Sequence, residues 1–153
     1  GLLTVHLQDG YGAATAAHFE ILIGSATQAN LLTGNDAGNL LVGGSTGDQL
    51  AGAGGHDILV GVFGGDVLYG DGAGTPGRDL LFGGSGADTQ YGGAEDDLLS
   101  GGGFDYTSPL DRPALDAIRL AWRSQTSYAH RIAKLQSGTG PSCVGQVTSG
   151  FVA

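Results

Sequence analysis

Aspartates recur at a fixed interval within a glycine-rich stretch of this chain. In the segment GGHDILVGVFGGDVLYG, residues 54–70, Asp57 and Asp66 lie nine residues apart, and each is followed two positions later by a leucine. Carboxylates and backbone carbonyls are the oxygen ligands that calcium prefers, and glycine lets a turn adopt positive φ so that its carbonyls face inward. The pattern therefore points first to the binding of a cation.

The interval holds over successive nine-residue units, which start at glycines from Gly34 onward and are preceded by a degenerate copy from Ser25. The unit that starts at Gly70 carries four extra residues, and Asp105 arrives one residue early in the frayed last unit. The sixth position is occupied by Asn30, Asn39, Asp48, Asp57, Asp66, Asp79, Asp88 and Asp97. The eighth position is occupied by Leu32, Leu41, Leu50, Leu59, Leu68, Leu81, Gln90 and Leu99.

These units resemble G-G-x-G-x-D-x-U-x, the nonapeptide of the RTX (haemolysin-type) calcium-binding proteins. The resemblance covers about half of the chain. It implies an all-β fold, a right-handed parallel β-roll in which each unit forms a six-residue turn and a three-residue strand. It also implies several Ca²⁺ ions between turns that stack on the same side. The metal ligands that it implies here are Asp48, Asp57, Asp66, Asp79, Asp88, Asp97 and Asp105.

Physical costs support a role for metal in folding. In such a roll, acids eighteen residues apart would lie about 4.8 Å apart, close enough to share one ion. Without a cation, two such carboxylates repel by roughly 3 kcal/mol at an effective dielectric of 20. Ordering the 23 glycines of residues 30–105 costs on the order of 10 to 20 kcal/mol in addition. The alternative, a metal-free solenoid whose acids only keep the turns soluble, does not explain six consecutive aspartates at the sixth position.

Some units depart from the pattern. Asn30 and Asn39 begin the sixth-position series, so we expect the opening sites to lose charge and affinity, or to bind nothing. Gln90 stands where a leucine is expected, which puts a polar side chain toward the core unless it reaches a partner. The extra residues between Gly70 and Arg78 lengthen one turn and are expected to bulge it.

Composition divides the chain into regions. We expect an N-terminal strand and lead-in at 1–24, the β-roll at 25–106, a helical hairpin at 107–138 and an irregular tail at 139–153. The hairpin follows from Arg112-Pro113 as a helix start, an apolar stripe that includes Trp122, and a second start at Ser127. We expect the hairpin to cap the open end of the roll, with a protein partner as the alternative.

Other classes of function fit the sequence poorly. The excess of 15 Asp and Glu over 6 Lys and Arg argues against a nucleic-acid surface. No apolar run approaches the length of a membrane span. We predict no catalytic residues, because the G-x-S-x-G match at 43–47 and the G-x-G-x-x-G match at 72–77 both fall inside the repeats. The histidines lack zinc spacing, and Cys143 is alone.

The sequence thus favours a calcium-stabilised structural module of a secreted or surface bacterial protein, not an enzyme. The resemblance implies an extracellular location reached by a type I secretion route, with folding on export from a low-calcium cytoplasm. The alternative is the C-terminal RTX portion of a secreted enzyme such as a protease or lipase. The chain begins at Gly1, and we expect it to be part of a longer protein.

Overall fold

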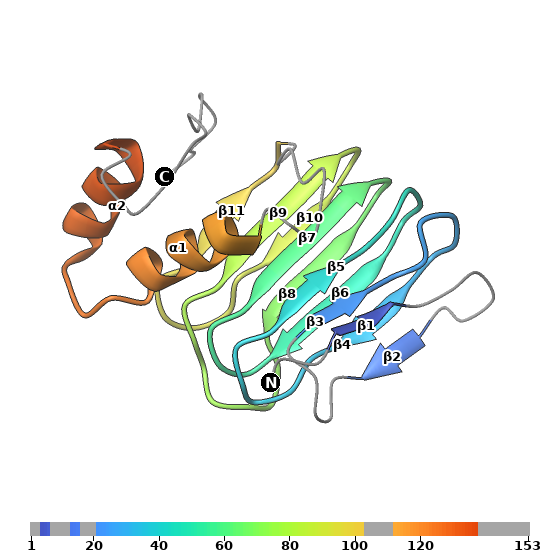
Figure 1. Cartoon of the computed structure of the whole chain (residues 1–153), viewed down its shortest axis with the longest axis horizontal. Coiled ribbons are helices and arrows are strands. Elements are labelled where there is room, and N and C mark those ends of the chain that lie inside the picture. Colours follow the sequence, from blue (N-terminus) through green and yellow to red (C-terminus); the bar gives the residue numbers. More distant parts are fainter. Residues whose placement is uncertain (1–3, 7–12, 16–20, 103–111, 138–153) are drawn as a thin grey trace. The chain divides into compact units, whose positions relative to one another are not determined.

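The structure is a computed structural model that describes residues 4–6, 13–15, 21–102 and 112–137. The chain divides into two compact units, Gly1–Phe104 and Asp105–Ala153. The first unit holds all the described strands, and the second holds both described helices (Figure 1). The two units have different sequence patterns, and different interactions stabilise them.

The first unit is built from short parallel strands that alternate between two sheets. One sheet has the strand order β1-β3-β5-β7-β9-β11, and the other has the order β10-β8-β6-β4-β2. Because consecutive strands fall in opposite sheets, the chain winds as a coil with two strands per turn, which confirms the predicted parallel β-roll (Figure 1). The strands are β1 (Thr4–His6), β2 (Ala13–Thr15), β3 (Ile21–Ile23), β4 (Leu31–Thr33), β5 (Leu40–Val42), β6 (Gln49–Ala53), β7 (Ile58–Phe63), β8 (Val67–Asp71), β9 (Leu80–Ser85), β10 (Thr89–Tyr91) and β11 (Leu98–Ser100).

The register of the strands follows the nine-residue unit. Leu40 pairs with Ile58 and Gln49 pairs with Val67, so one coil takes eighteen residues. Across the insertion the spacing becomes twenty-two, with Ile58 opposite Leu80. The four extra residues are therefore absorbed in one long turn, and the strands on either side keep their alignment.

A single file of leucines forms the core between the two sheets. Because side chains alternate along a strand, the second residue of each strand from β3 to β9 points inward from its sheet. These residues are almost completely buried and form one cluster: Leu22, Leu32, Leu41, Leu50, Leu59, Leu68 and Leu81. Leu99, which occupies the same position in β11, is 39% exposed, because no described coil stacks on that strand.

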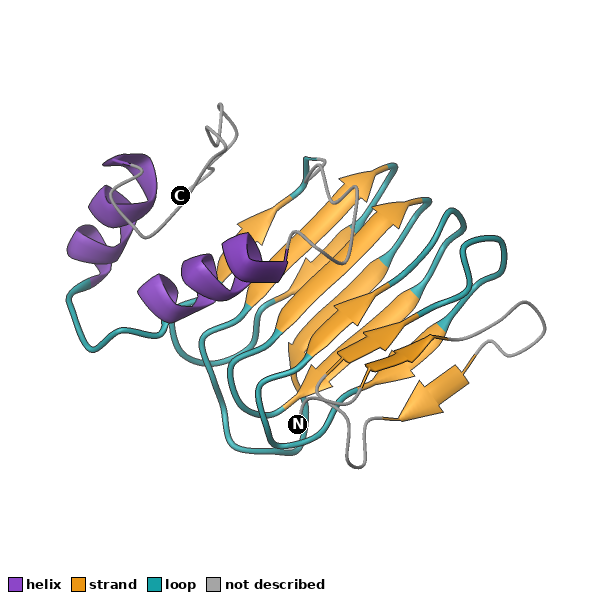
Figure 2. Ribbon diagram, in the orientation of Figure 1, coloured by secondary structure: helices purple, strands orange, loops and turns teal. Residues whose placement is uncertain are grey.

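The second unit contains two short helices, α1 (Arg112–Trp122) and α2 (Tyr128–Ser137) (Figure 2). Pro113 lies in the first turn of α1, where its missing N–H costs nothing, and the Ser127 carbonyl accepts the backbone N–H of Arg131 at the start of α2. Neither described helix has the length and apolar character needed to cross a membrane. The two predicted helices are confirmed, whereas a capping role for them stays a prediction.

Candidate metal sites

The sixth-position side chains form two ladders, one at each edge of the roll where the turns stack. On one side, the Asp48 backbone N–H donates to Asp66 Oδ1 at 2.7 Å, and the Asp66 N–H donates to Asp88 Oδ1 at 3.0 Å. On the other side, the same bond joins Asp57 to Asp79 at 2.8 Å and Asp79 to Asp97 at 2.9 Å. The structure therefore brings together six of the seven aspartates that the sequence singled out, and Asp105 lies outside the described residues.

One oxygen of several ladder carboxylates is buried without a partner. The Oδ2 atoms of Asp66, Asp79 and Asp88 are shielded from solvent and accept no hydrogen bond from any described group. The Asp66 and Asp79 side chains are 0% exposed. A buried anionic oxygen without a donor is costly, so each of these atoms requires a positive group that a protein donor does not supply here.

The first glycine of each unit borders the space that these oxygens face. A Cβ on Gly61 would collide with Asp66 Oδ2 and also with the carbonyl oxygen of Gly83 in the next coil. Gly70 repeats this arrangement with Asp79 Oδ2 and the Gly92 carbonyl. Carboxylate and carbonyl oxygens from two successive coils thus converge on a space that any side chain at the first position would fill.

The electrostatics of the ladders reflect this crowding of acids. Burial raises the pKa of Asp79 from 3.8 to about 7, and nearby Asp97 and Asp71 push it in the same direction. Burial likewise raises the pKa of Asp66 to about 6, with repulsion from Asp48 and Asp88 adding to it. Asp97 follows the same pattern, with a pKa of about 6. Without a cation, the fold thus keeps Asp79 partly protonated near neutral pH, whereas Asp66 and Asp97 lose most of their protons above pH 6.

The donor set fits a hard cation better than a transition metal. The described residues contain no compact group of three or more His, Cys, Asp or Glu side chains, so side chains alone do not form a complete site. Carboxylates of successive coils together with turn carbonyls supply only oxygen, and calcium accepts six to eight oxygen ligands in flexible geometry. Zinc sites instead rely on closed sets of nitrogen and sulfur ligands.

Departures from the repeat are absorbed by local hydrogen bonds. In the long turn, Asp71 accepts the N–H of Gly77 at 3.2 Å and that of Ala94 at 2.6 Å, and His56 Nδ1 accepts the N–H of Arg78 at 2.8 Å. Gln90 donates from Nε2 to the Ser100 carbonyl at 2.8 Å, which gives this half-buried amide the partner that its position needed. The insertion therefore leaves the ladder spacing intact.

Two residues near the start of the roll were missed by counting from Ser25. The first glycine position of the earliest complete turn is held by Gly24, because a Cβ there would meet the Asn30 side chain as a Cβ on Gly43 would meet Asp48. This turn is one residue longer than the others, which hides it from a strict nine-residue count. Leu22, in the strand before it, belongs to the core leucine file. The triplet Ile21-Leu22-Ile23 followed by Gly24 was the available signal.

Coiled parallel strands with converging turn oxygens define a repeat solenoid of the cation-binding β-roll class. Residues 33–68 and 73–107, just under half of the chain, match the family described as RTX calcium-binding nonapeptide repeat (4 copies). Residues 33–107 thus carry repeats of this family, and such repeats bind several Ca²⁺ ions. Comparisons with curated proteins and with solved structures gave no match. This repeat region is therefore a calcium-binding structural module.

Proposed function

We propose that each calcium ion is held between two successive turns on one side of the roll. The proposal rests on one observation, the buried Oδ2 atoms of Asp66, Asp79 and Asp88 that have no hydrogen-bond donor. Carboxylates from adjacent coils would neutralise each ion, and turn carbonyls such as that of Gly83 would complete its shell. The proposed ligands are Asp48, Asp57, Asp66, Asp79, Asp88 and Asp97, with Asp105 added from its sequence position alone.

The module acts in this proposal as a non-catalytic folding unit of a secreted or surface bacterial protein. Calcium binding energy becomes folding energy when the unbound chain cannot hold the acids together. Extracellular calcium modules work at roughly 0.1 to 1 mM calcium, far above the calcium level of a cytoplasm. The repeat region would then stay unfolded before export. A type I secretion route fits a chain that folds only when it meets extracellular calcium. A protein partner for the helical hairpin stays a prediction.

Calcium titration monitored by far-UV circular dichroism tests the proposal. In chelator, we expect the signal of β structure to be largely lost, and it should return in millimolar Ca²⁺. Magnesium at the same concentration should restore little, because it demands a rigid octahedron and retains its waters. Equal spectra in chelator and in calcium would overturn the proposed function.

A further inference from the structure

The side chain of Asn30 occupies the first place of one ladder and makes a full set of contacts there. This side chain is 4% exposed. Its Nδ2 atom donates to the Ser25 carbonyl at 3.0 Å, to the Gln28 carbonyl at 2.9 Å, and to Asp48 Oδ1 in the next coil at 2.8 Å. Two turn carbonyls and one carboxylate oxygen from the following coil thus surround a single nitrogen.

The surrounding atoms fix the orientation of the Asn30 carboxamide. Its Oδ1 atom accepts the backbone N–H of Ser25 at 2.7 Å. If the amide were rotated by half a turn, its oxygen would face three other oxygens and its NH₂ group would face an N–H donor. Only the orientation with Nδ2 toward the oxygens satisfies every neighbouring group.

Asp48 consequently differs from the next acid in its ladder. Its Oδ1 accepts both the backbone N–H and the side-chain Nδ2 of Asn30, and its Oδ2 accepts the N–H of Gly44 at 2.6 Å. Asp66 Oδ2, by contrast, is buried without any donor. On the side that faces Asn30, the carboxylate of Asp48 is therefore satisfied by the protein itself.

We propose that the Asn30 amide takes the place of the ion in the interval between Asn30 and Asp48. A partly positive NH₂ group sits among the oxygens of two coils, which is the arrangement a cation would require in the intervals between aspartates. The roll then has one built-in turn that needs no calcium, beside turns that do. This inference rests on the proposed function, because it assumes that the aspartate intervals bind calcium.

The substitution Asn30→Asp tests this assignment because it changes one NH₂ group into an oxygen. The new carboxylate would face Asp48 Oδ1 and two carbonyls with no proton donor, so a cation becomes necessary in that interval. Asn35→Asp is the matched control, since it adds the same charge in a neighbouring turn at a side chain whose Oδ1 already accepts the Ala37 N–H at 2.8 Å. That control adds no acid at a sixth position.

Isothermal titration calorimetry with CaCl₂ on the full chain gives the number of bound ions for each protein. We expect Asn30→Asp to bind about one ion more than the wild type, and Asn35→Asp to bind the same number as the wild type. An unchanged number for Asn30→Asp overturns the inference, as does an equal gain for both variants. If the wild type itself binds no calcium, the proposed function fails instead, which keeps the two failures separate.

Hydrogen exchange on the wild type provides a second measurement that does not depend on the folding of a variant. In calcium-saturated protein, the buried and hydrogen-bonded NH₂ of Asn30 should exchange at least about tenfold more slowly than the side-chain NH₂ of the exposed Gln49. If an ion occupied this interval, it would displace the amide from the oxygens. Equally fast exchange of the two side chains would therefore overturn the inference.

Discussion

The roll and the helical unit reach order by different means. In the roll, one leucine per nine residues fills the space between the two sheets, and buried acids stack at each edge. In the helical unit, the aromatic ring of Trp122 meets that of Tyr128 edge-on at 5.7 Å, and the Arg131 guanidinium lies 5.1 Å from the Trp122 ring centre. The roll thus contains an electrostatic conflict that a cation resolves, whereas the helical unit pairs its buried charge with aromatic rings.

Because of this difference, removal of calcium should affect the roll and not the contacts within the helical unit. Removal of calcium leaves the ladder acids in mutual repulsion, but it removes nothing from the stack of Arg131 on its two aromatic neighbours. Trp122 is the only tryptophan of the chain and ends α1, so its fluorescence reports on the environment of that helix. Calcium binding and tryptophan emission therefore give separate readouts for the two regions.

The largest effect is expected from Asp66→Ala. Asp66 faces Asp48 on one side and Asp88 on the other, so its loss removes a carboxylate from two intervals at once. The calcium midpoint should rise by at least about tenfold, because calcium affinity depends on the number of charged ligands. Calcium titration at fixed ionic strength measures the midpoint, and the emission of Trp122 should stay unchanged.

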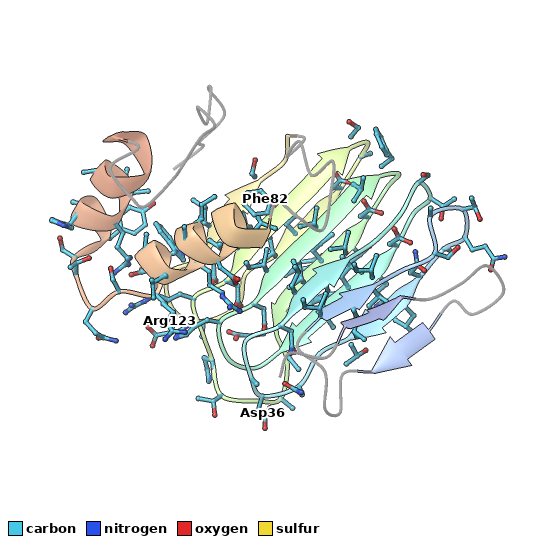
Figure 3. All side chains as sticks on the ribbon, viewed as in Figure 1. Asp36, Phe82 and Arg123 are labelled. Atoms are coloured by element: carbon cyan, nitrogen blue, oxygen red, sulfur yellow. The ribbon has the colours of Figure 1, made fainter. Side chains whose placement is uncertain are left out.

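Asp36→Ala is the control for this change. Asp36 carries the same charge but is exposed, and it occupies the third position of its unit rather than the sixth (Figure 3). A screened acidic surface would respond alike to the loss of either charge. Equal shifts of the calcium midpoint for the two variants would show that the nine-residue register does not define the sites.

The dependence of calcium binding on pH comes next in size. The pKa of Asp79 is about 7 and those of Asp66 and Asp97 are about 6 in the calcium-free fold, compared with the ordinary 3.8. Raised values mean that protons stabilise this fold below pH 3.8 and that the benefit is lost as pH rises through 6 to 7. Calcium needs the deprotonated groups, so lowering the pH from 8 to 5.5 should raise the calcium midpoint by roughly tenfold or more. A midpoint that does not change with pH would contradict burial of these carboxylates.

Arg131→Ala should destabilise the helical unit and leave calcium binding by the roll unchanged. Arg131 is 2% exposed, it stacks on Trp122 and Tyr128, and its guanidinium donates to the Thr126 carbonyl. Loss of these contacts should destabilise the helices by about 1–3 kcal/mol, which thermal unfolding followed by Trp122 emission would detect. Arg123→Ala, at an exposed side chain near the end of α1 (Figure 3), should change the unfolding little. A change in calcium stoichiometry for Arg131→Ala would show that the two regions are not separable in this way.

Much of the roll could be predicted because one short period determines both its ladder and its core. The aspartates from Asp48 to Asp97 and the leucines from Leu32 to Leu81 occupy the positions that the repeat indicates. The period also showed where the insertion lies, since a turn at the edge of a roll can lengthen without disturbing paired strands.

Features that depend on hydrogen-bond direction could not be predicted in the same way. The period marks Asn30 as a departure, but only the three oxygens around its Nδ2 show what the amide does there. Leu99 follows the pattern and is still 39% exposed, because burial requires a following coil as well as the right residue. The hydrogen bonds and the burial of such side chains depend on residues eighteen or more positions away. A nine-residue repeat pattern does not predict these contacts.

The smallest predicted effect concerns backbone strain, which also separates the two units. Every described residue with positive φ lies in the roll, and three of these are not glycine: Ala53, Val62 and Glu95. Val62 has a φ of 89°, a conformation that is costly for a β-branched side chain, and it stands at the second position, where the family pattern has glycine. The helices contain no such strain among their described residues.

Val62→Gly should therefore stabilise the calcium-bound roll by about 1 kcal/mol. Release of strain of roughly 1–3 kcal/mol outweighs the entropy of roughly 0.5–1 kcal/mol that glycine adds to the unfolded chain. Val67→Gly is the matched control, because Val67 lies in β8 without positive φ and should lose packing and chain entropy with no strain to release. Urea unfolding at saturating calcium measures both variants, and Trp122 emission should follow neither change. A destabilised Val62→Gly would show that β7 accommodates valine at this position without strain. It would also show that the glycines of the repeat are required at the ladder rather than at this second position.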